Sequence, residues 1–309
     1  MKASTIIRKR KKAIAGGLAL PLLMGFTSCA VFKCRYESWN QKVVRGPDGV
    51  IQAAQARSWG SGDHALLLVH GFGDGPHVWK KLGPELAERG YRVRAMRLPG
   101  WNEPIEVKRD IKLADWEHAI IDEAQRLKQE HDKVAVLAHS LGGCISTKLV
   151  QSGDLPADAL VLYAPMFGVS SERSPLLDTR TWYRIGDLVL PDDMILESLF
   201  PDHARVTEPR PRTERDPFVP VGMYHLLYTE MDRRDAQVPI IRIPVRLVLP
   251  GEDRVVDSPK ARAWFHNLTA PTKTLYTDDP SGHVLPLDID KLAEADRLVI
   301  WLTEQGITP

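Results

Sequence analysis

The sequence of 309 residues has few cysteines and almost no imbalance of charge, and each shortage excludes a class of protein. Three cysteines are too few for the set of disulfides that stabilises small secreted domains. With 41 basic and 40 acidic residues the net charge is only +1, so the composition gives no reason to expect a nucleic-acid partner. Because 43% of the residues are hydrophobic, the chain is neither disordered nor collagen-like. The length allows one large α/β domain or two small ones.

The amino terminus lacks acidic residues entirely, since none precedes Glu37. Basic residues concentrate between Lys2 and Lys12, and an uncharged, mostly apolar run extends from Ala13 to Phe32. A basic segment followed by an apolar one and then by small residues is the pattern of a secretory signal. Loss of residues 1–28 would remove six of the 41 basic residues and no acidic ones, which leaves a net charge of −5. We therefore predict a leader at residues 1–28 and a mildly acidic, exported domain at residues 29–309.

The end of this leader resembles the lipobox of bacterial lipoproteins, in which a cysteine becomes the lipidated first residue. The segment reads Gly25-Phe26-Thr27-Ser28-Cys29, with Phe26 at the position where that motif usually has an aliphatic residue. Cys29 is the candidate for lipidation, and we expect a lipoprotein attached to a membrane of the cell envelope. Two alternatives stay open. The uncharged run of 20 residues is about long enough to span a bilayer as an uncleaved anchor, and simple secretion is the other alternative.

Strand and helix signals alternate along the rest of the chain. Apolar runs bounded by turn residues predict strands, and apolar residues spaced three and four apart predict helices. A hairpin is predicted where Gly46-Pro47-Asp48-Gly49 separates two apolar segments, 43–44 and 50–56. The alternation indicates an α/β fold with a mostly parallel central sheet and helices on both of its faces. The predicted strands are residues 65–69, 91–98, 134–138, 159–163, 245–249 and 274–277, and the predicted helices are residues 76–89, 112–131, 141–151 and about 288–304.

One long stretch interrupts the alternation. Ten of the 23 prolines lie between Pro165 and Pro244, together with a group of arginines and aromatic residues. Long connections without regular structure are uncommon in compact domains and often act as lids over active sites. We predict an inserted lid or cap at about residues 166–243; the alternative is a surface excursion with no part in binding.

A serine with the surroundings of a catalytic nucleophile lies between a predicted buried strand and a predicted helix. The segment reads Ala138-His139-Ser140-Leu141-Gly142-Gly143. This is the arrangement of a nucleophile elbow, usually written G-x-S-x-G, in which small residues two positions before and after the serine avoid clashes in a strained turn. Ala138 replaces the first glycine by another small residue. We predict that Ser140 is the nucleophile, at the positive end of the helix that follows it.

A serine nucleophile needs a base, and the base needs an acid that orients it. In enzymes with this elbow the acid and then the histidine follow the serine along the chain, at the carboxyl ends of strands. His283 follows the last predicted strand in Asp279-Pro280-Ser281-Gly282-His283, and Asp253 follows the preceding strand. We predict His283 as the base and Asp253 as the orienting acid, with Glu252 and Asp257 as alternatives for the acid.

Two backbone N–H groups are expected to form an oxyanion hole. One belongs to Leu141, directly after the nucleophile, and the other to Phe72 in the glycine-rich loop His70-Gly71-Phe72-Gly73-Asp74-Gly75. This loop is not a phosphate-binding P-loop, because no Gly-Lys-Ser/Thr follows it. His70 is expected to support the loop by hydrogen bonding. No group of Cys, His and carboxylate residues has convincing zinc spacing, and acyl transfer by a serine triad needs neither a metal nor an organic cofactor, so we predict none.

Residues from about 64 to 304 resemble a serine α/β-hydrolase. Within that group they are similar to bacterial carboxylesterases and monoacylglycerol lipases, which share the wider family with lysophospholipase-type enzymes. Trp101 departs from the pattern, because many relatives have histidine after the Pro-Gly pair. The motifs that carry the resemblance are His70-Gly71-Phe72-Gly73, Leu98-Pro99-Gly100, Asp115-Trp116, His139-Ser140-Leu141-Gly142-Gly143, Tyr163-Ala164-Pro165-Met166 and Ser281-Gly282-His283-Val284.

This resemblance implies hydrolysis of carboxylic esters of short- to medium-chain acyl groups, through an acyl-enzyme formed on Ser140 and with a helical cap over an apolar acyl pocket. The expected partner is a small-molecule acyl ester or a lipid, and the oligomeric state stays open. A thioesterase, lysophospholipase, aminopeptidase or cofactor-free haloperoxidase would use the same triad. A non-catalytic surface lipoprotein built on a hydrolase scaffold is a further alternative. A dehalogenase or epoxide hydrolase would have aspartate at the elbow, so Ser140 argues against both.

Overall fold

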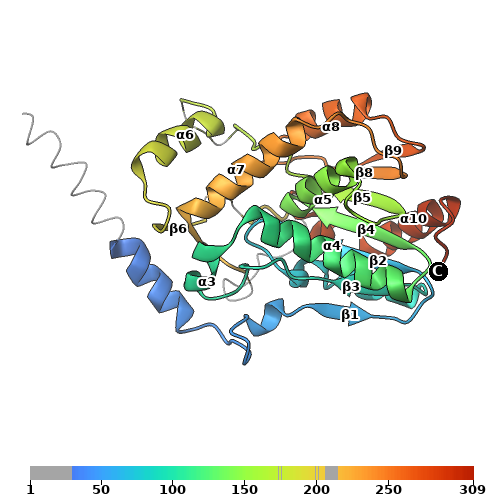
Figure 1. Ribbon diagram of the computed structural model, residues 1–309, viewed down its shortest axis with the longest axis horizontal. Coiled ribbons are helices and arrows are strands. Elements are labelled where there is room, and N and C mark those ends of the chain that lie inside the picture. Colours follow the sequence, from blue (N-terminus) through green and yellow to red (C-terminus); the bar gives the residue numbers. More distant parts are fainter. Residues whose placement is uncertain (1–29, 173, 175, 199, 201, 206–214) are drawn as a thin grey trace, which may run out of the picture.

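A seven-stranded sheet forms the centre of the protein, with its strands in the order β1-β3-β2-β4-β5-β8-β9 (Figure 1). The computed structural model describes residues 30–309 except 173, 175, 199, 201 and 206–214. Every neighbouring pair of strands in this sheet is parallel except β1 with β3, which confirms the predicted α/β fold. The strands are β1 (Arg57–Trp59), β2 (Ala65–Val69), β3 (Arg92–Ala95), β4 (Val134–His139), β5 (Ala159–Tyr163), β8 (Val245–Pro250) and β9 (Lys273–Asp278).

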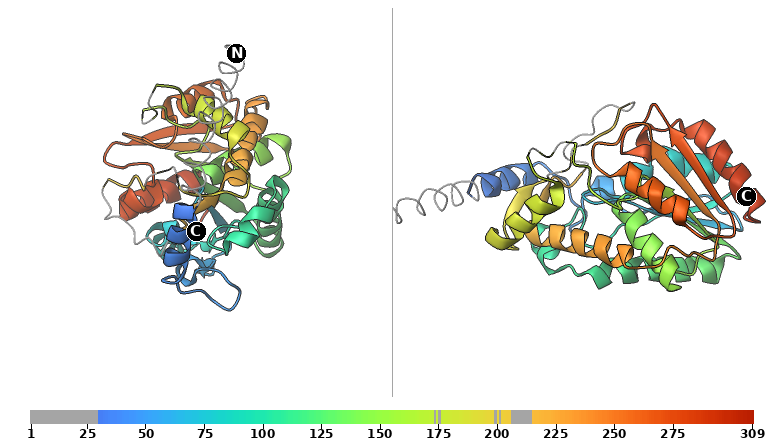
Figure 2. Two further views of the ribbon diagram at one scale, coloured as in Figure 1. Left: turned by 90° about the vertical axis from the view of Figure 1, so that its left-hand side faces the viewer. Right: turned by 90° about the horizontal axis from the view of Figure 1, so that it is seen from above.

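Helices cover both faces of the sheet. On one face α2 packs against α10, and on the other α4 packs against α5 (Figure 2). Every residue of β2, β4, β5 and β8 is therefore buried, which explains why these strands are almost entirely apolar in the sequence. The helices of this main domain are α2 (Leu82–Glu88), α3 (Ile105–Asp110), α4 (Leu113–Glu130), α5 (Leu141–Ser152), α8 (Ser258–Asn267), α9 (Leu285–Asp288) and α10 (Lys291–Glu304), with short 3-10 helices at Gln52–Ala54 and Pro76–Trp79.

Several expectations fail in residues 45–89, the amino-terminal part of the main domain. Residues 46–49 form a turn, but a single antiparallel bridge between Arg45 and Ile51 and a 3-10 helix replace the predicted hairpin strands. The predicted helix at 76–89 is divided into a 3-10 helix and α2, because Pro84 has no N–H and its ring disfavours a preceding helical turn. The edge strand β1 was not predicted, since three residues are too few to show a period.

The insertion at residues 166–243 contains two helices and a two-stranded antiparallel sheet among its described residues. It lies over the carboxyl ends of the strands: Val169 forms a bridge with Val256, and the carbonyl of His203 accepts the N–H of Val284 at 3.2 Å. One of its helices, α7, packs along α5. The insertion therefore has more regular structure than its many prolines indicate. Its elements are α6 (Thr179–Val189), β6 (Ile195–Glu197), β7 (Phe218–Pro220) and α7 (Val221–Asp235).

A helix at residues 30–40 packs against the insertion (Figures 1 and 2). Tyr36 and Trp39 are buried against Phe218 of β7, with ring centroids 5.7 and 5.6 Å from that of Phe218. Arg35 pairs with Glu197 of β6 at 2.6 Å. The predicted leader, residues 1–28, and Cys29 lie outside the described residues. Of the helices in the described part of the chain, none is long and apolar enough to cross a membrane.

Candidate active site

The three side chains predicted to form a catalytic triad meet at one edge of the sheet. Ser140 directly follows β4, Asp253 follows β8 and His283 follows β9. The carboxyl ends of parallel strands lie along the same edge, where catalytic groups gather in open α/β sheets. All three residues are buried, with Ser140 only 2% exposed. The fold thus brings Ser140 to two residues that lie more than a hundred positions after it in the sequence.

Ser140 occupies a strained turn, with φ of 54° and ψ of −118°. A positive φ is uncommon for a residue other than glycine and persists only where the surroundings enforce it. Those surroundings leave no room for larger neighbours. A Cβ on Gly71 would lie 2.7 Å from the Cβ of Ser140, and one on Gly142 would lie 2.5 Å from the carbonyl oxygen of His70. Ala138, which replaces the first glycine of the usual motif, is accommodated and fully buried in β4.

A chain of hydrogen bonds links the three side chains. His283 Nε2 lies 3.1 Å from the Oγ of Ser140, and His283 Nδ1 lies 2.9 Å from the Oδ2 of Asp253. In a neutral imidazole one ring nitrogen donates and the other accepts. The carboxylate can only accept, so Nδ1–H donates to Asp253 and Nε2 is left to accept the Ser140 hydroxyl. In this tautomer the ring is placed to take the serine proton.

The carboxylate of Asp253 is held by the backbone that follows it. Its Oδ1 accepts the N–H groups of Val255 and Val256 at 2.8 and 2.9 Å. Burial by itself would raise the pKa of the Asp253 carboxyl, but the His283 ring and the two backbone donors hold that pKa below its ordinary value. The group therefore stays ionised where it faces the imidazole.

The two alternative acids have other partners. Glu252 is partly exposed and pairs with Arg254 at 2.5 Å. Asp257 caps the amino end of α8, where its Oδ1 accepts the N–H of Lys260 at 2.9 Å. The structure therefore pairs His283 with Asp253.

Contacts that no sequence motif indicated hold the loop of His283. Asp288 of α9 is buried, and its Oδ2 accepts the N–H of Gly282 at 2.9 Å. From the other side, the insertion contributes the hydrogen bond between the His203 carbonyl and the N–H of Val284. A lone aspartate at the end of a short helix gives no pattern signal, so only the folded structure identifies Asp288 as a support of this loop.

The glycine-rich loop after β2 lies against the serine turn and is held by His70. The Nδ1–H of His70 donates to the carbonyl of Gly71 at 2.9 Å, and its Nε2 accepts the N–H of Leu98 at 2.9 Å. Burial lowers the pKa of His70 to about 4, so the ring is neutral and one tautomer makes both bonds. His70 therefore supports the loop in the way that the sequence predicts.

Of the predicted oxyanion donors, Leu141 directly follows Ser140, and Phe72 belongs to the glycine-rich loop that lies against the serine turn. Leu141 is the first residue of α5, where a backbone N–H has no acceptor within its own helix. Phe72 follows Gly71, the residue whose backbone approaches Ser140. The oxyanion role of the two N–H groups stays a prediction.

Two other reactive side chains near Ser140 are not placed for chemistry. His139 donates its Nε2–H to the carbonyl of His283 at 3.0 Å, and burial together with the His283 ring lowers its pKa to about 3. Cys144 is buried in α5, and burial raises the pKa of its thiol to about 12. A neutral histidine and a protonated thiol fit packing roles beside the nucleophile.

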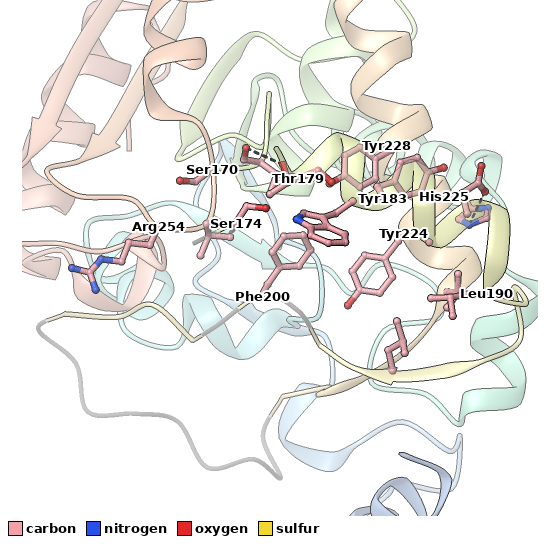
Figure 3. Close-up of a pocket in the computed structure, with 17 residues that line it drawn as sticks. Ser170, Ser174, Thr179, Tyr183, Leu190, Phe200, Tyr224, His225, Tyr228 and Arg254 are labelled. Carbon is pink, nitrogen blue, oxygen red and sulfur yellow. Dashed lines mark hydrogen bonds and ion pairs between the residues drawn. The ribbon is translucent and has the colours of Figure 1, made fainter. Parts of the chain in front are cut away.

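A cavity of about 440 Å³ lies between α6 and α7 of the insertion and extends to the loop after β8 (Figure 3). Its wall is mostly apolar and aromatic, and Tyr183 of α6 stacks on Tyr228 of α7 with ring centroids 4.1 Å apart. His225, at one end of the cavity, pairs with Asp187 at 3.1 Å, and Arg254 lies at the opposite end (Figure 3). The cavity therefore offers an elongated, largely apolar space with charged groups at both ends.

Aromatic rings connect this cavity to the glycine-rich loop. Ser140 is not among the described residues that line the cavity, but Phe200 and Tyr224 line it and also contact Phe72. The Phe72 ring centroid lies 5.5 Å from that of Phe200 and 5.2 Å from that of Tyr224. Trp101, where many relatives have histidine, is fully buried against Phe72 at a centroid distance of 4.5 Å. These rings form the boundary between the cavity and the loop beside the serine turn.

Fold and site together define an α/β-hydrolase. The chain belongs to the family described as serine aminopeptidase S33, whose family model matches residues 60–290. It is 26% identical over 235 residues to a carboxylesterase of Bacillus subtilis (strain 168), with 74% of this chain and 88% of that protein covered. It is likewise 26% identical over 252 residues to a thermostable monoacylglycerol lipase of Bacillus sp. (strain H-257), with 78% and 91% covered.

Solved structures show the same fold. A monoacylglycerol lipase of Paleococcus ferrophilus superposes with a TM-score of 0.67 at 18% identity, over 81% of this chain and 98% of that one. The family match and the two relatives from Bacillus confirm the resemblance to carboxylesterases and monoacylglycerol lipases that the motifs indicated.

Proposed function

We propose that the protein is a serine esterase that cleaves carboxylic esters through an acyl-enzyme on Ser140. The Ser140 hydroxyl attacks the ester carbonyl while His283 takes its proton, and Asp253 stabilises the imidazolium that forms. The N–H groups of Phe72 and Leu141 stabilise the tetrahedral oxyanion. The alcohol leaves with the proton from His283, and a water molecule deprotonated by the same ring then releases the acid.

The observation that carries this proposal is the hydrogen-bonded chain from Ser140 through His283 to Asp253. Its distances of 3.1 and 2.9 Å lie within the range for proton transfer in a folded site. Thioesterases and aminopeptidases use the same triad. The triad therefore indicates acyl transfer but does not identify the substrate. Ester hydrolysis is favoured by the two relatives from Bacillus, which are aligned over most of their length.

The apolar cavity lined by the insertion favours an ester with a hydrocarbon chain as the substrate. A wall of aromatic rings with few polar groups favours an acyl chain over a peptide, whose amide groups would lose their hydrogen bonds to water. A monoacylglycerol or a related lipid ester fits this description. The insertion then acts as the lid or cap that the sequence predicts, and it covers the loops of Ser140, Asp253 and His283.

Activity measurements on protein that lacks residues 1–28 test the proposal. Rates are compared across p-nitrophenyl esters of increasing chain length, monoacylglycerols, a lysophospholipid, an acyl thioester and an aminoacyl p-nitroanilide. We expect hydrolysis of the oxygen esters with a preference for a medium-length chain. Turnover of the thioester alone would instead indicate a thioesterase, and turnover of the anilide alone would indicate an aminopeptidase.

A bulky residue at Gly186 is expected to shorten the accepted acyl chain. Gly186 of α6 lines the cavity, so the side chain in Gly186→Leu would occupy space that an acyl chain needs. Relative to the acetate ester, kcat/KM for the laurate ester should fall about tenfold, because a few methylene groups lose their apolar contacts. The measurement is kcat/KM for the series from acetate to laurate.

Gly186→Ala is the matched control. A Cβ at this position would lie 3.7 Å from Leu190, an ordinary contact, so the cavity changes little. Alanine in place of glycine within a helix should also stabilise the protein by about 1 kcal/mol. Equal chain-length profiles for the leucine and alanine variants would mean that acyl chains do not bind in this cavity.

We further propose that the protein is exported and attached to a membrane of the cell envelope through a lipid on Cys29. Exposed apolar side chains on α6 are consistent with contact to a lipid surface, since Leu188 is 86% and Val189 66% exposed. The helix at residues 30–40, which follows the leader, lies at the same end of the molecule as α6 (Figures 1 and 2). A lipid anchor would therefore bring the insertion close to the membrane.

Metabolic labelling with an alkyne fatty acid tests the anchor. The full-length chain should become labelled in a bacterial host, Cys29→Ser should lose the label, and Cys34→Ser should keep it. Cys34 is the matched control because it is an exposed cysteine five positions further on. An unlabelled wild-type chain would contradict lipidation, and its amino-terminal sequence would then distinguish an uncleaved anchor from a secreted product.

A further inference from the structure

A buried ion pair joins the insertion to the main domain. Asp216, two residues before β7, and Lys108 of α3 both have fully buried side chains, and the Lys108 ammonium donates to Asp216 Oδ1. Lys108 also donates to the carbonyl of Phe218 at 3.0 Å. Burial lowers the pKa of Lys108, and the Asp216 carboxylate opposes that effect. A contribution to stability does not by itself account for such a pair. A protein with two apolar residues of similar volume in place of a buried ion pair is often equally stable.

The remaining hydrogen-bonding groups of Asp216 reach the two loops that surround Phe72. Its Oδ2 accepts the N–H of Asn102 at 2.8 Å, and its own N–H donates to the carbonyl of Gly73 at 3.3 Å. Gly73 directly follows Phe72, and Asn102 directly follows Trp101, whose ring packs on that of Phe72. A single residue of the insertion thus holds the backbone directly after Phe72 and the backbone of the loop whose Trp101 ring packs on Phe72.

Each of the two loops has a residue in the left-handed backbone region at its hydrogen bond to Asp216. Gly73 has φ of 73° and Asn102 has φ of 62°, in the left-handed region that few residues adopt readily. The side chain of Asn102 also donates to the carbonyl of Asp74 at 2.8 Å, which ties the second loop to the first. Glycine adopts this region freely, whereas the left-handed conformation of Asn102 persists because neighbouring groups hold it.

We propose that Asp216 and Lys108 are a positioning pair that fixes the Phe72 N–H for the oxyanion and so couples the oxyanion hole to the insertion. This inference rests on the proposed esterase function. Asp216 touches neither substrate nor the reacting atoms; it acts through the backbone of Gly73 and Asn102. Lys108 holds the carboxylate in place and compensates its charge.

Three variants separate positioning from a purely structural role. Asp216→Asn keeps an oxygen for the N–H of Asn102 but leaves Lys108 as an uncompensated buried cation. Lys108→Met/Asp216→Leu removes both charges and also the acceptor for Asn102. Lys108→Met/Asp216→Asn removes both charges but keeps that acceptor. The two double variants avoid a lone buried charge, so both should fold.

Each variant is assayed for kcat and KM with p-nitrophenyl butyrate, for Ki with a trifluoromethyl ketone, and for melting temperature. The ketone forms a tetrahedral adduct whose oxyanion needs the same N–H donors as the transition state. In Lys108→Met/Asp216→Leu we expect kcat to fall about 10- to 100-fold with little change in KM, since a displacement of about 1 Å at a reacting centre has effects of that size. Inhibition by the ketone should weaken by the same factor, and Lys108→Met/Asp216→Asn should recover most of the kcat.

Lys148→Met is the control for breaking an ion pair elsewhere. Lys148 of α5 pairs with Glu117 of α4 at 2.6 Å, and its loss should lower the melting temperature without changing kcat of the folded enzyme. Wild-type kcat and ketone affinity in Lys108→Met/Asp216→Leu would overturn the positioning role and leave the esterase function intact. The role is equally overturned if both double variants are slow to the same degree and their loss follows the fraction of unfolded protein. A wild-type enzyme that neither hydrolyses the ester nor reacts with a fluorophosphonate would overturn both proposals.

Discussion

Ser140→Ala is expected to lower kcat for a p-nitrophenyl ester about 10⁶-fold, because the variant lacks the oxygen that forms the acyl-enzyme. The residual rate should still exceed the uncatalysed rate by about 10³-fold, since the oxyanion donors and the binding pocket remain. Two measurements check this result: steady-state hydrolysis, and covalent labelling with a fluorophosphonate followed by intact mass.

The fold should tolerate the change, since alanine is smaller than serine and the strained turn is held by its neighbours. Ser152→Ala provides the matched control, because Ser152 is exposed at the far end of the same helix, α5. That variant should hydrolyse the ester and react with the fluorophosphonate like the wild type. Full activity in Ser140→Ala would show that another residue is the nucleophile.

Asp253→Asn is expected to lower kcat about 10⁴-fold by placing the imidazole of His283 in the wrong tautomer. The N–H groups of Val255 and Val256 donate to one oxygen of Asp253, and in the variant they would hold the amide oxygen at that position. The amide NH₂ would then face His283 Nδ1, which must accept. The ring proton would move to Nε2, where it faces Ser140 and prevents the ring from taking the serine proton.

Glu252→Gln and Asp257→Asn are the controls, since both residues are neighbouring acids that sequence spacing alone leaves as candidates. Glu252 pairs with Arg254, and asparagine at position 257 would keep an oxygen for capping α8. Both controls should keep kcat close to the wild-type value. If Asp253→Asn were as active as these two, the orienting acid would have to be sought elsewhere.

The strands and helices that could be predicted are those with a strong period or a long apolar run. The four strands that helices cover on both faces are almost entirely apolar, and the structure confirms their predicted bounds within one residue at each end: β2, β4, β5 and β8. The helix predicted at residues 112–131 corresponds to α4, whose Trp116, Ile120, Ala124 and Leu127 are buried on one side. Local patterns of this kind need no knowledge of distant contacts.

The predictions that failed involve elements whose form depends on their neighbours. The edge strand β1 has only three residues and is defined by its pairing with β3, so the segment alone gives no signal. The strands of the hairpin expected around residues 46–49 do not form beyond a single bridge, because residues 52–54 adopt a 3-10 helix. In the insertion, the many prolines indicate little regular structure. Its described residues nevertheless form two helices and a small sheet that contacts with distant residues hold against the main domain.

The sequence by itself determined which residues are candidates for the chemistry. The serine turn needs small residues at fixed spacing, and the acid and base come after strands in a fixed order, so Ser140, Asp253 and His283 could be named from local context. Only the tertiary structure decided which carboxylate faces His283 and how the loops around it are held. Glu252, Asp253 and Asp257 lie within six positions, and hydrogen-bond geometry that cannot be read from spacing selects Asp253.

The same reason explains why Asp288, Asp216 and Lys108 gave no signal in the sequence. Each of them makes a hydrogen bond to the backbone of a segment that only folding brings close to it, and a single polar residue has no period. The spacing of apolar and small residues determines the elements and the order of the catalytic groups. The partners of buried charges are determined only by the folded structure. Folding removes these charges from water, so each must find its ion-pair and hydrogen-bond partners among the groups that pack around it.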